Sequence, residues 1–180
     1  TPNSSVSMKK IGGTTSEFPE IAIFPATHYV APQTRFKEVL TEIRGELHDQ
    51  LNALRRADKI LEAARLVQRT RYDLQMLEET NYVHGIENYS RYFDGRQPGQ
   101  PPFTLIDFFK YAYGNQWLAC IDESHITIPQ IRGMYAGDRS RKTTLIDYGF
   151  RLPSCLDNRP LQFDEFRERV TRTIYVSATP

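Results

Sequence analysis

Two adjacent carboxylates, Asp122 and Glu123, follow directly after a short apolar run, and His125 follows them within one helical turn. The run at residues 117–121 has the composition of a strand that is buried on both faces of a parallel sheet. Ligands of open α/β sheets bind outside the carboxyl ends of the strands, where these two acids stand. One carboxylate there can hold Mg²⁺ through water while its neighbour orients or deprotonates an attacking water. The pattern therefore predicts a site for nucleotide hydrolysis.

The same acids have two other interpretations. Asp-Glu pairs commonly cap a helix or end a strand in solvent, without further function. A metal-dependent hydrolase with Asp122, Glu123 and His125 as ligands is the second alternative, although side chains on such close positions converge on one ion with difficulty. The apolar run before the acids, and Ser124 and His125 after them, favour the nucleotide site.

Short apolar or β-branched segments predict the strands that position these acids, in an α/β fold with a parallel sheet. The predicted strands are residues 21–24, 117–122 and 173–177. Residues 105–113 predict a short helix or strand, and residues 163–169 carry a helix start signal. Pro129 and Gly133 predict that the chain breaks shortly after the acids.

Residues 34 to about 80 have a helical pattern, in which apolar residues recur at steps of three and four. The pattern slips at residues 55–59, so we expect two helices that form a hairpin packed on the sheet. The hairpin carries a basic set: Arg55, Arg56, Arg65, Arg69 and Arg71. Nearby acids balance these charges, so a solvated face is the default interpretation and a nucleic-acid surface is the alternative.

Residues 81–104 are rich in turn residues and aromatics, which is typical of a functional loop. The aromatic side chains with a possible binding role are Tyr82, Tyr89, Tyr92 and Phe93. Beside Arg91 and Arg96 they could stack bases and contact phosphate. They could equally fill the gap between hairpin and sheet, with the tyrosine hydroxyls outward.

The composition is that of a globular protein with the size of one domain. The chain has 180 residues, 25% of them charged, and a net charge of +1 that gives no whole-chain reason for a nucleic-acid or membrane partner. Cys120 and Cys155 fit no metal-ligand spacing, so reduced thiols of a cytosolic protein are expected. No apolar run could cross a bilayer and no leader is present, which predicts a soluble, unprocessed, cytoplasmic protein without a membrane partner.

The tetrad DESH at 122–125, with SAT at 177–179 after a second predicted strand, resembles motifs II and III of the superfamily 2 helicases. Longer segments are similar to the family of UvrB, the helicase-like component of the bacterial UvrABC excinuclease. They are IFPATHYV at 23–30, QRTRYDLQML at 68–77, GIENYSR at 85–91, DESHITIPQIRGMYAGDRSRK at 122–142 and GFRLPSCLDNRPLQFDEF at 149–166. The resemblance covers about residues 20 to 180.

The resemblance implies a partial RecA-like parallel sheet, the P-loop-containing NTPase fold of a helicase domain 1, with an inserted helical subdomain. Residues 20–33 and 105–180 would form the RecA-like part with motifs II and III, and residues 34–104 the helical insertion. Residues 1–19 would be a lead-in or the edge of a UvrA-docking domain. An incomplete sheet also predicts an exposed strand edge.

The resemblance further implies a role for each motif residue. Asp122 would help to hold Mg²⁺ through water, Glu123 would position the hydrolytic water, and His125 would link the nucleotide site to neighbouring motifs. The coupling motif, which relates nucleotide state to DNA movement, would be Ser177, Ala178 and Thr179. The candidates for DNA contacts would be Arg69, Arg71, Arg151 and Arg159.

One departure from the family affects the nucleotide site most. No segment of the sequence fits the P-loop pattern G-x-x-x-x-G-K-[ST], whose lysine and backbone amides cradle the phosphates. We therefore expect a fragment of the motor domain. The full-length family would use ATP and Mg²⁺, whereas this chain is expected to bind neither cofactor and to be inactive alone.

The function that the resemblance implies is ATP-dependent verification of damaged DNA in the UvrABC nucleotide excision repair system. The family's helicase-like protein would be loaded by UvrA and would recruit UvrC for incision. Damaged DNA, UvrA and UvrC are thus the expected partners. The alternative is that this segment alone acts as a non-enzymatic DNA-binding or docking module.

Overall fold

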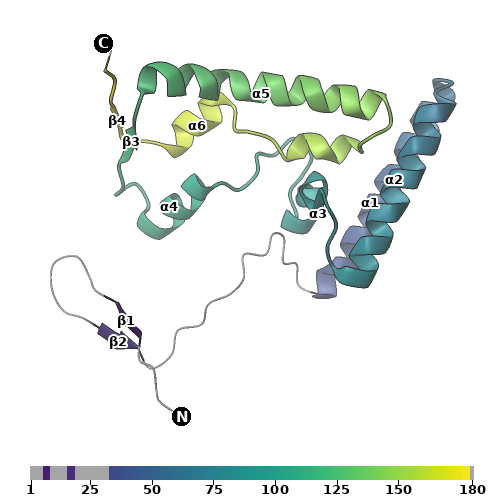
Figure 1. Cartoon of the computed structure of the whole chain (residues 1–180), viewed down its shortest axis with the longest axis horizontal. Helices are drawn as coiled ribbons and strands as arrows, with labels where there is room; N and C mark the ends of the chain where they lie inside the picture. Colours follow the sequence, from purple (N-terminus) through teal and green to yellow (C-terminus); the bar gives the residue numbers. More distant parts are fainter. Residues whose placement is uncertain (1–5, 9–15, 19–32, 179–180) are drawn as a thin grey trace. The chain divides into compact units, whose positions relative to one another are not determined.

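The computed structural model describes residues 6–8, 16–18 and 33–178, and the chain divides into two compact units, residues 1–30 and residues 31–180. In the first unit, β1 (Val6–Met8) pairs antiparallel with β2 (Ser16–Phe18) (Figure 1). The strand predicted at residues 21–24 lies outside the described residues. All other described elements belong to the second unit.

The predicted helical hairpin is confirmed, but its predicted packing on the sheet is not found, because its main contacts among the described residues are with other helical segments. α1 (Gln33–Arg56) and α2 (Ile60–Thr80) pack against each other and are joined at the point where the apolar pattern slips (Figure 1). The aliphatic side chains at their contact are at most 1% exposed: Val39, Ile43, Leu66 and Leu77. Each such side chain stabilises the fold by about 1.5–3 kcal/mol, so the apolar stripe explains why the two helices associate.

The turn-rich segment after the hairpin folds into η1 (Ile86–Tyr89) and α3 (Ser90–Asp94). Tyr89, Tyr92 and Phe93 are at most 8% exposed, whereas Tyr82 is 46% exposed. The Tyr89 hydroxyl points inward and donates to Asp73 Oδ2 at 2.8 Å. Because three of these four rings fill the interior, base stacking is wrong for them and packing is right, although the Tyr89 hydroxyl is not outward.

The two strands predicted around the candidate motifs pair with each other. β3 (Ala119–Ile121) runs parallel to β4 (Thr173–Tyr175), with Cys120 opposite Ile174. The prediction that the run at residues 117–121 is buried on both faces is wrong in this structure, since Leu118 is 52% exposed and Cys120 is exposed. The reason is that, among the described residues, no further strand extends this pair, so no complete layers cover it.

The predicted α/β fold class is therefore confirmed only in part. The described residues are mostly helical, with β3 and β4 as a small parallel sheet. A RecA-like P-loop sheet is not seen in the described residues. The division into residues 1–19, 20–33 with 105–180, and 34–104 stays a prediction.

α4 (Leu105–Tyr113) begins at a capping box and is tied to α6 (Phe163–Arg169). The main-chain amide and hydroxyl of Thr104 both donate to Asp107 Oδ2 at 2.7 Å, and Arg169 Nε lies 2.9 Å from Asp107 Oδ1. Burial alone would raise the pKa of Asp107, but these hydrogen bonds and the arginine outweigh it and lower the pKa. One carboxylate thus starts one helix and holds another.

α5 (Ser124–Asp147) corrects the predicted break, because it runs as one helix through Pro129 and Gly133. Proline near the start of a helix already has a helical φ and removes one intrahelical hydrogen bond. The bonds of the following turns outweigh that loss. The 24-residue helix is about 36 Å long at about 1.5 Å per residue. The acidic motif therefore lies about that far from Asp147, at the opposite end of α5.

α5 ends in a Schellman motif that approaches α2 closely. The amide of Gly149 donates to the Ile146 carbonyl and the amide of Phe150 donates to the Leu145 carbonyl, at 2.9 and 2.8 Å. Gly149 has a φ of +72°, and a Cβ there would overlap the backbone of Glu62 in α2. Glycine is thus required both by the left-handed conformation and by the contact between the helices.

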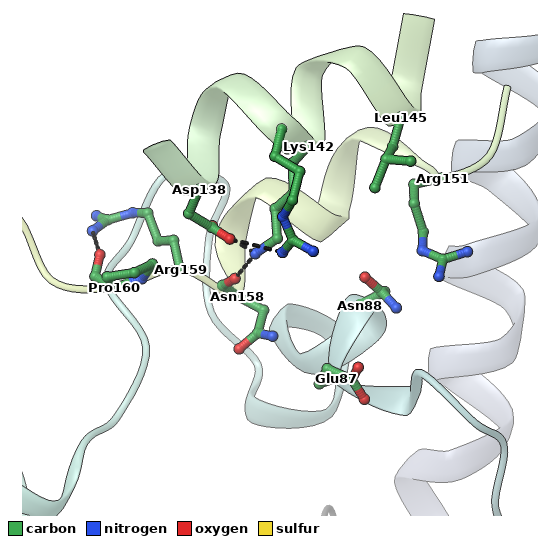
Figure 2. Close-up of a pocket in the computed structure, with 10 residues that line it drawn as sticks. Glu87, Asn88, Asp138, Lys142, Leu145, Arg151, Asn158, Arg159 and Pro160 are labelled. Atoms are coloured by element: carbon green, nitrogen blue, oxygen red, sulfur yellow. Dashed lines mark hydrogen bonds and ion pairs between the residues drawn. The ribbon is translucent and has the colours of Figure 1, made fainter. Parts of the chain in front are cut away.

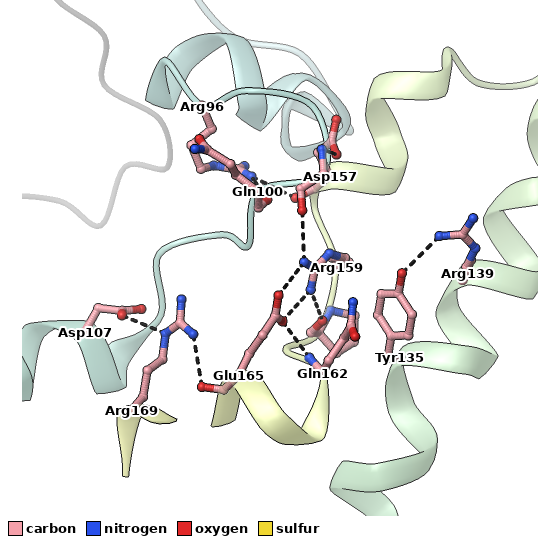
Figure 3. Close-up of polar contacts among 12 residues, drawn as sticks. Arg96, Gln100, Asp107, Tyr135, Arg139, Asp157, Arg159, Gln162, Glu165 and Arg169 are labelled. Carbon is pink, nitrogen blue, oxygen red and sulfur yellow. Dashed lines mark hydrogen bonds and ion pairs between the residues drawn. The ribbon is translucent and has the colours of Figure 1, made fainter. Parts of the chain in front are cut away.

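η2 (Pro153–Asp157) packs between α5 and α3, and polar contacts fasten it to α3 and the residues that follow it. Arg91 Nη1 lies 2.7 Å from Asp157 Oδ2, and Arg96 Nη1 donates to the Asp157 carbonyl at 3.0 Å. Figure 3 shows Arg96 and Asp157 in this contact.

No helix of the described residues is both long and apolar enough to cross a membrane.

Candidate functional site

The two acids stand at the end of β3 as predicted from the sequence. Glu123 has a φ of 44°, a left-handed conformation that is uncommon for residues other than glycine. Its amide donates to Asp122 Oδ1 at 2.9 Å, and the Thr127 hydroxyl donates to the Asp122 carbonyl at 3.0 Å. Both carboxylates are exposed. The local turn therefore holds two solvent-facing oxygen donors at the carboxyl edge of the small sheet.

His125 brings the two candidate motifs together. Its Nδ1 atom lies 2.9 Å from Ser177 Oγ and 3.4 Å from Glu123 Oε2. The backbone supports this contact, because the Ser124 amide donates to the Val176 carbonyl and the Val176 amide donates to the Ile121 carbonyl, each at 2.9 Å. Because of these contacts, a displacement of residues 122–125 would also move residues 176–177.

The other predicted members of these motifs are placed less fully. Ala178 is exposed, and Thr179 lies outside the described residues. In the part of the chain that the structure describes, no group of three or more His, Cys, Asp or Glu side chains is arranged to hold a metal ion. The structure therefore gives no support to a three-ligand hydrolase centre at these residues.

An open pocket of about 790 Å³ lies beside the His125–Ser177 contact. Two cations of its wall, Arg132 from α5 and Arg167 from α6, were not singled out by their spacing in the sequence. The Arg132 guanidinium lies 4.6 Å from the centre of the Phe163 ring. Neither Asp122 nor Glu123 lines this pocket. Its guanidinium and hydroxyl groups could hold an anion next to the two motifs.

Arg69 and Arg71 lie on α2 with different surroundings. Arg69 Nε is 3.2 Å from Asp73 Oδ1, and its Nη2 donates to the His84 carbonyl at 3.2 Å. Burial raises the pKa of Asp73, while Tyr89 and Arg69 oppose that rise. Arg71 is exposed. Arg69 thus compensates a buried carboxylate, and Arg71 faces solvent.

Arg151 and Arg159 line one polar pocket of about 330 Å³ between α5 and η1 (Figure 2). Lys142 is buried in its wall, where it pairs with Asp138 Oδ2 at 2.8 Å and donates to the Asn158 carbonyl. Arg151 donates to the carbonyl of its neighbour Phe150 at 2.9 Å. Its positive charge also opposes the rise that burial causes in the pKa of Asp73, so Arg151 is a partly compensated cation.

Arg159 has a more structural environment (Figure 3). Its two terminal nitrogens lie 2.7 and 2.8 Å from the oxygens of Glu165, and it donates to the Gly99 carbonyl at 3.2 Å. Its guanidinium stands 5.2 Å from the centre of the Tyr135 ring, and its side chain is 7% exposed. The hydrogen bond to Glu165 raises the pKa of Arg159. Arg159 fastens the segment after η2 to α6. Few of its hydrogen-bond donors are therefore accessible to DNA.

A third depression, the α2 groove, combines arginines that the sequence analysis named with three residues that it did not select, Gln68, Tyr72 and Phe150. It measures about 450 Å³ and is lined by Arg65, Gln68, Arg69, Tyr72, Phe150 and Arg151. Tyr72 is 55% exposed and Phe150 is 43% exposed. Steps of three and four along α2 place its members on one face, but nothing in the sequence indicates that residues 150 and 151 lie opposite.

The two cysteines are free, as predicted. Cys155 is fully buried, and burial raises the pKa of its thiol to about 11. A thiol with such a pKa is protonated at neutral pH and is a poor nucleophile. Cys155 is therefore part of the packing around η2 and is not a catalytic group.

Comparisons with known proteins give consistent results. Residues 34–95 match the family model of the UvrB third helical domain. The chain is 54% identical to UvrABC system protein B of Enterococcus faecalis and 56% identical to that of Symbiobacterium thermophilum, in each case over 94% of this chain and 25% of the relative. It is 58% identical to the Chloroflexus aggregans protein of the same name, over 89% of this chain and 24% of the relative. The chain thus spans about a quarter of the length of these relatives.

Proposed function

Because this chain is related to UvrABC system protein B over nearly its whole length, we propose that it provides the corresponding part of a UvrB-type protein in nucleotide excision repair. The observation that carries the proposal is the identity of 54% and 56% over 94% of the chain, together with the family match at residues 34–95, which contains most of the helical hairpin. The relatives do not favour the alternative of an independent docking module.

In this proposal, the part with β3, β4 and α5 belongs to a RecA-like helicase domain whose other strands lie in the rest of the protein. The parallel pairing of β3 with β4 and the position of the acids at a strand end support it. So does the exposure of Leu118 and Ile174, because strands of a complete parallel sheet are covered on both faces.

ATP and Mg²⁺ are proposed as cofactors of the whole protein. Asp122 and Glu123 fit such a role because they are exposed oxygen donors, the ligands that Mg²⁺ prefers. Asp122 would hold the ion through water, and Glu123 would position the attacking water. The bound ion would neutralise charge on the phosphates during transfer. His125 would couple changes at the nucleotide site to Ser177 through their contact. Ala178 and Thr179 would be the other residues of the coupling motif.

Damaged DNA, UvrA and UvrC are the proposed partners, in a cytoplasmic protein. For DNA, Arg151 and Arg71 are the better candidates, since Arg69 and Arg159 already compensate carboxylates. This ranking follows the rule that an arginine held in a buried ion pair loses much by leaving it.

A chimaera tests the proposal directly. This chain replaces the matching quarter of the Enterococcus faecalis protein, and incision of damaged DNA is measured with UvrA and UvrC of that organism. We expect incision by the chimaera, and its loss in the chimaera with Glu123→Gln. A folded chimaera that supports no incision, although the unaltered protein does, would contradict the proposed function.

A further inference from the structure

The α2 groove has a local charge that the composition of the chain does not suggest. Three of its six lining residues are arginines and none is acidic, although the whole chain has a net charge of +1. Asp73 partly balances Arg69. The charge of Arg151 also acts on Asp73, and Arg151 donates to the Phe150 carbonyl at 2.9 Å. Arg65 donates to the Tyr148 carbonyl at 2.6 Å. The groove therefore presents at least two guanidinium charges to a polyanion.

Two exposed aromatic rings line the groove together with these charges. Tyr72 is 55% exposed and Phe150 is 43% exposed, so both leave ring surface in contact with water. The Arg65 guanidinium covers part of Phe150 at 4.5 Å from the ring centre, which leaves Tyr72 as the more accessible platform. Aromatic rings that alternate with cations are the combination by which proteins hold single strands, because bases stack on the rings while phosphates meet the cations.

The two walls of the groove are fixed to each other before any ligand arrives. Lys59 donates to the Asp147 carbonyl at 3.3 Å, and Arg65 donates to the Tyr148 carbonyl at 2.6 Å. Gly149 permits this approach because a Cβ there would overlap Glu62. A preformed groove binds without the entropy cost of ordering its walls.

From these observations we infer that the α2 groove binds single-stranded nucleic acid, with one base stacked on Tyr72 and the flanking phosphates on Arg65 and Arg151. The inference deepens the proposed function and rests on its DNA partner, for which it names a site and a form. A single strand is favoured over a duplex because a base inside a duplex keeps both faces stacked on its neighbours and offers none to Tyr72.

The test measures binding of a fluorescent oligothymidylate, and of a duplex of the same length, by anisotropy at several salt concentrations. Tyr72→Ala should weaken binding of the single strand by at least about fivefold, the lower limit for one lost base-aromatic stack. Tyr72→Phe should keep the affinity, because the ring remains. The matched control is Tyr111→Ala in α4, since Tyr111 is 93% exposed and lies outside the groove.

The charge is tested separately with Arg65→Gln. It should reduce the slope of log affinity against log salt by about 0.7, the value for one phosphate contact on a single strand. Far-ultraviolet circular dichroism and the thermal midpoint of each variant show whether the fold is kept. For the exposed Tyr72 both should match the unaltered chain.

The outcomes separate this inference from the function on which it rests. Single-strand binding that Tyr72→Ala leaves unchanged would overturn the α2 groove and leave DNA binding by the chain intact. Preference for the duplex would also overturn it. Failure of the unaltered chain to bind either form would also overturn the groove, and incision by the chimaera would then decide whether the proposed function still stands.

Discussion

Arg151 and Arg159 show at the residue scale why residue type alone does not assign a role. They stand eight positions apart in one segment and line one pocket. Arg159 is held by both oxygens of Glu165, whereas Arg151 donates to the carbonyl of its neighbour. The family resemblance implied both as DNA candidates, because the partner of Arg159 becomes visible only when α6 folds back beside it.

Substitution Arg159→Gln should lower the free energy of unfolding by about 2 kcal/mol, since Glu165 would lose a two-point, charge-assisted partner in a largely buried place. Urea denaturation followed by circular dichroism measures the change. The matched control is Arg71→Gln on the exposed side of α2, which should stay within about 0.5 kcal/mol. Equal losses in the two variants would show that the Arg159 contact contributes nothing particular.

Glu165 predicts a dependence of stability on pH. The hydrogen bond from Arg159, followed by that from the Gln162 amide, lowers the pKa of Glu165 below its ordinary value of 4.5. A carboxyl whose pKa is lower in the folded state stabilises the fold above its unfolded pKa, and this stabilisation is lost as the pH falls through the folded pKa. The raised pKa of Asp73 acts in the opposite direction.

The variant Glu165→Gln isolates the first contribution. The difference in unfolding free energy between the unaltered chain and the variant should be greatest near neutral pH and should shrink as the pH falls below about 4.5. Urea midpoints at a series of pH values measure it. A difference that is constant with pH would mean that the charge of Glu165 is not stabilising.

At the scale of elements, α5 joins the two ends of the unit. It begins at the acidic motif and ends at the Schellman motif against α2. The sequence predicted a break inside it, because Pro129 and Gly133 are local signals that the contacts at its two ends override. The helices of the hairpin were predictable for the opposite reason, since their apolar stripe and their packing partner lie in the same stretch of sequence.

Gly149→Ala tests the contact between α5 and α2. Alanine at a φ of +72° costs about 1–2 kcal/mol, and the overlap of its Cβ with the Glu62 backbone adds to that cost. We expect a loss of at least about 2 kcal/mol in unfolding free energy, measured by thermal or urea denaturation.

Gly133→Ala is the matched control, because a Cβ there meets nothing within 4 Å and Gly133 lies inside α5. It should stabilise the chain by about 0.5–1 kcal/mol, the usual gain from alanine in a helix. If both glycines responded alike, the close approach at Gly149 would not be a determinant of the fold.

For the whole molecule, sequence similarity identifies the family, whereas the structure shows which segments are covered or face each other. The sequence segments identified the UvrB family correctly, and the relatives match 94% of the chain. The parallel pairing of the two motif strands was also predictable. The exposure of β3 and the α2 groove were not, because both depend on which distant elements are present to cover or face a segment. The sequence of one strand does not show how many strands pair beside it.

The most direct measurement on the chain combines two readings in the same samples. DNA that carries a bulky adduct and a fluorophore is titrated with the chain at low and moderate salt, and ATP hydrolysis is followed at the same time. We predict binding that weakens with salt, from the cations of α2 and Arg151, without hydrolysis, because the sequence has no P-loop to cradle the phosphates. Hydrolysis that Glu123→Gln abolishes would contradict this prediction, since the chain would then build a complete phosphate site by itself.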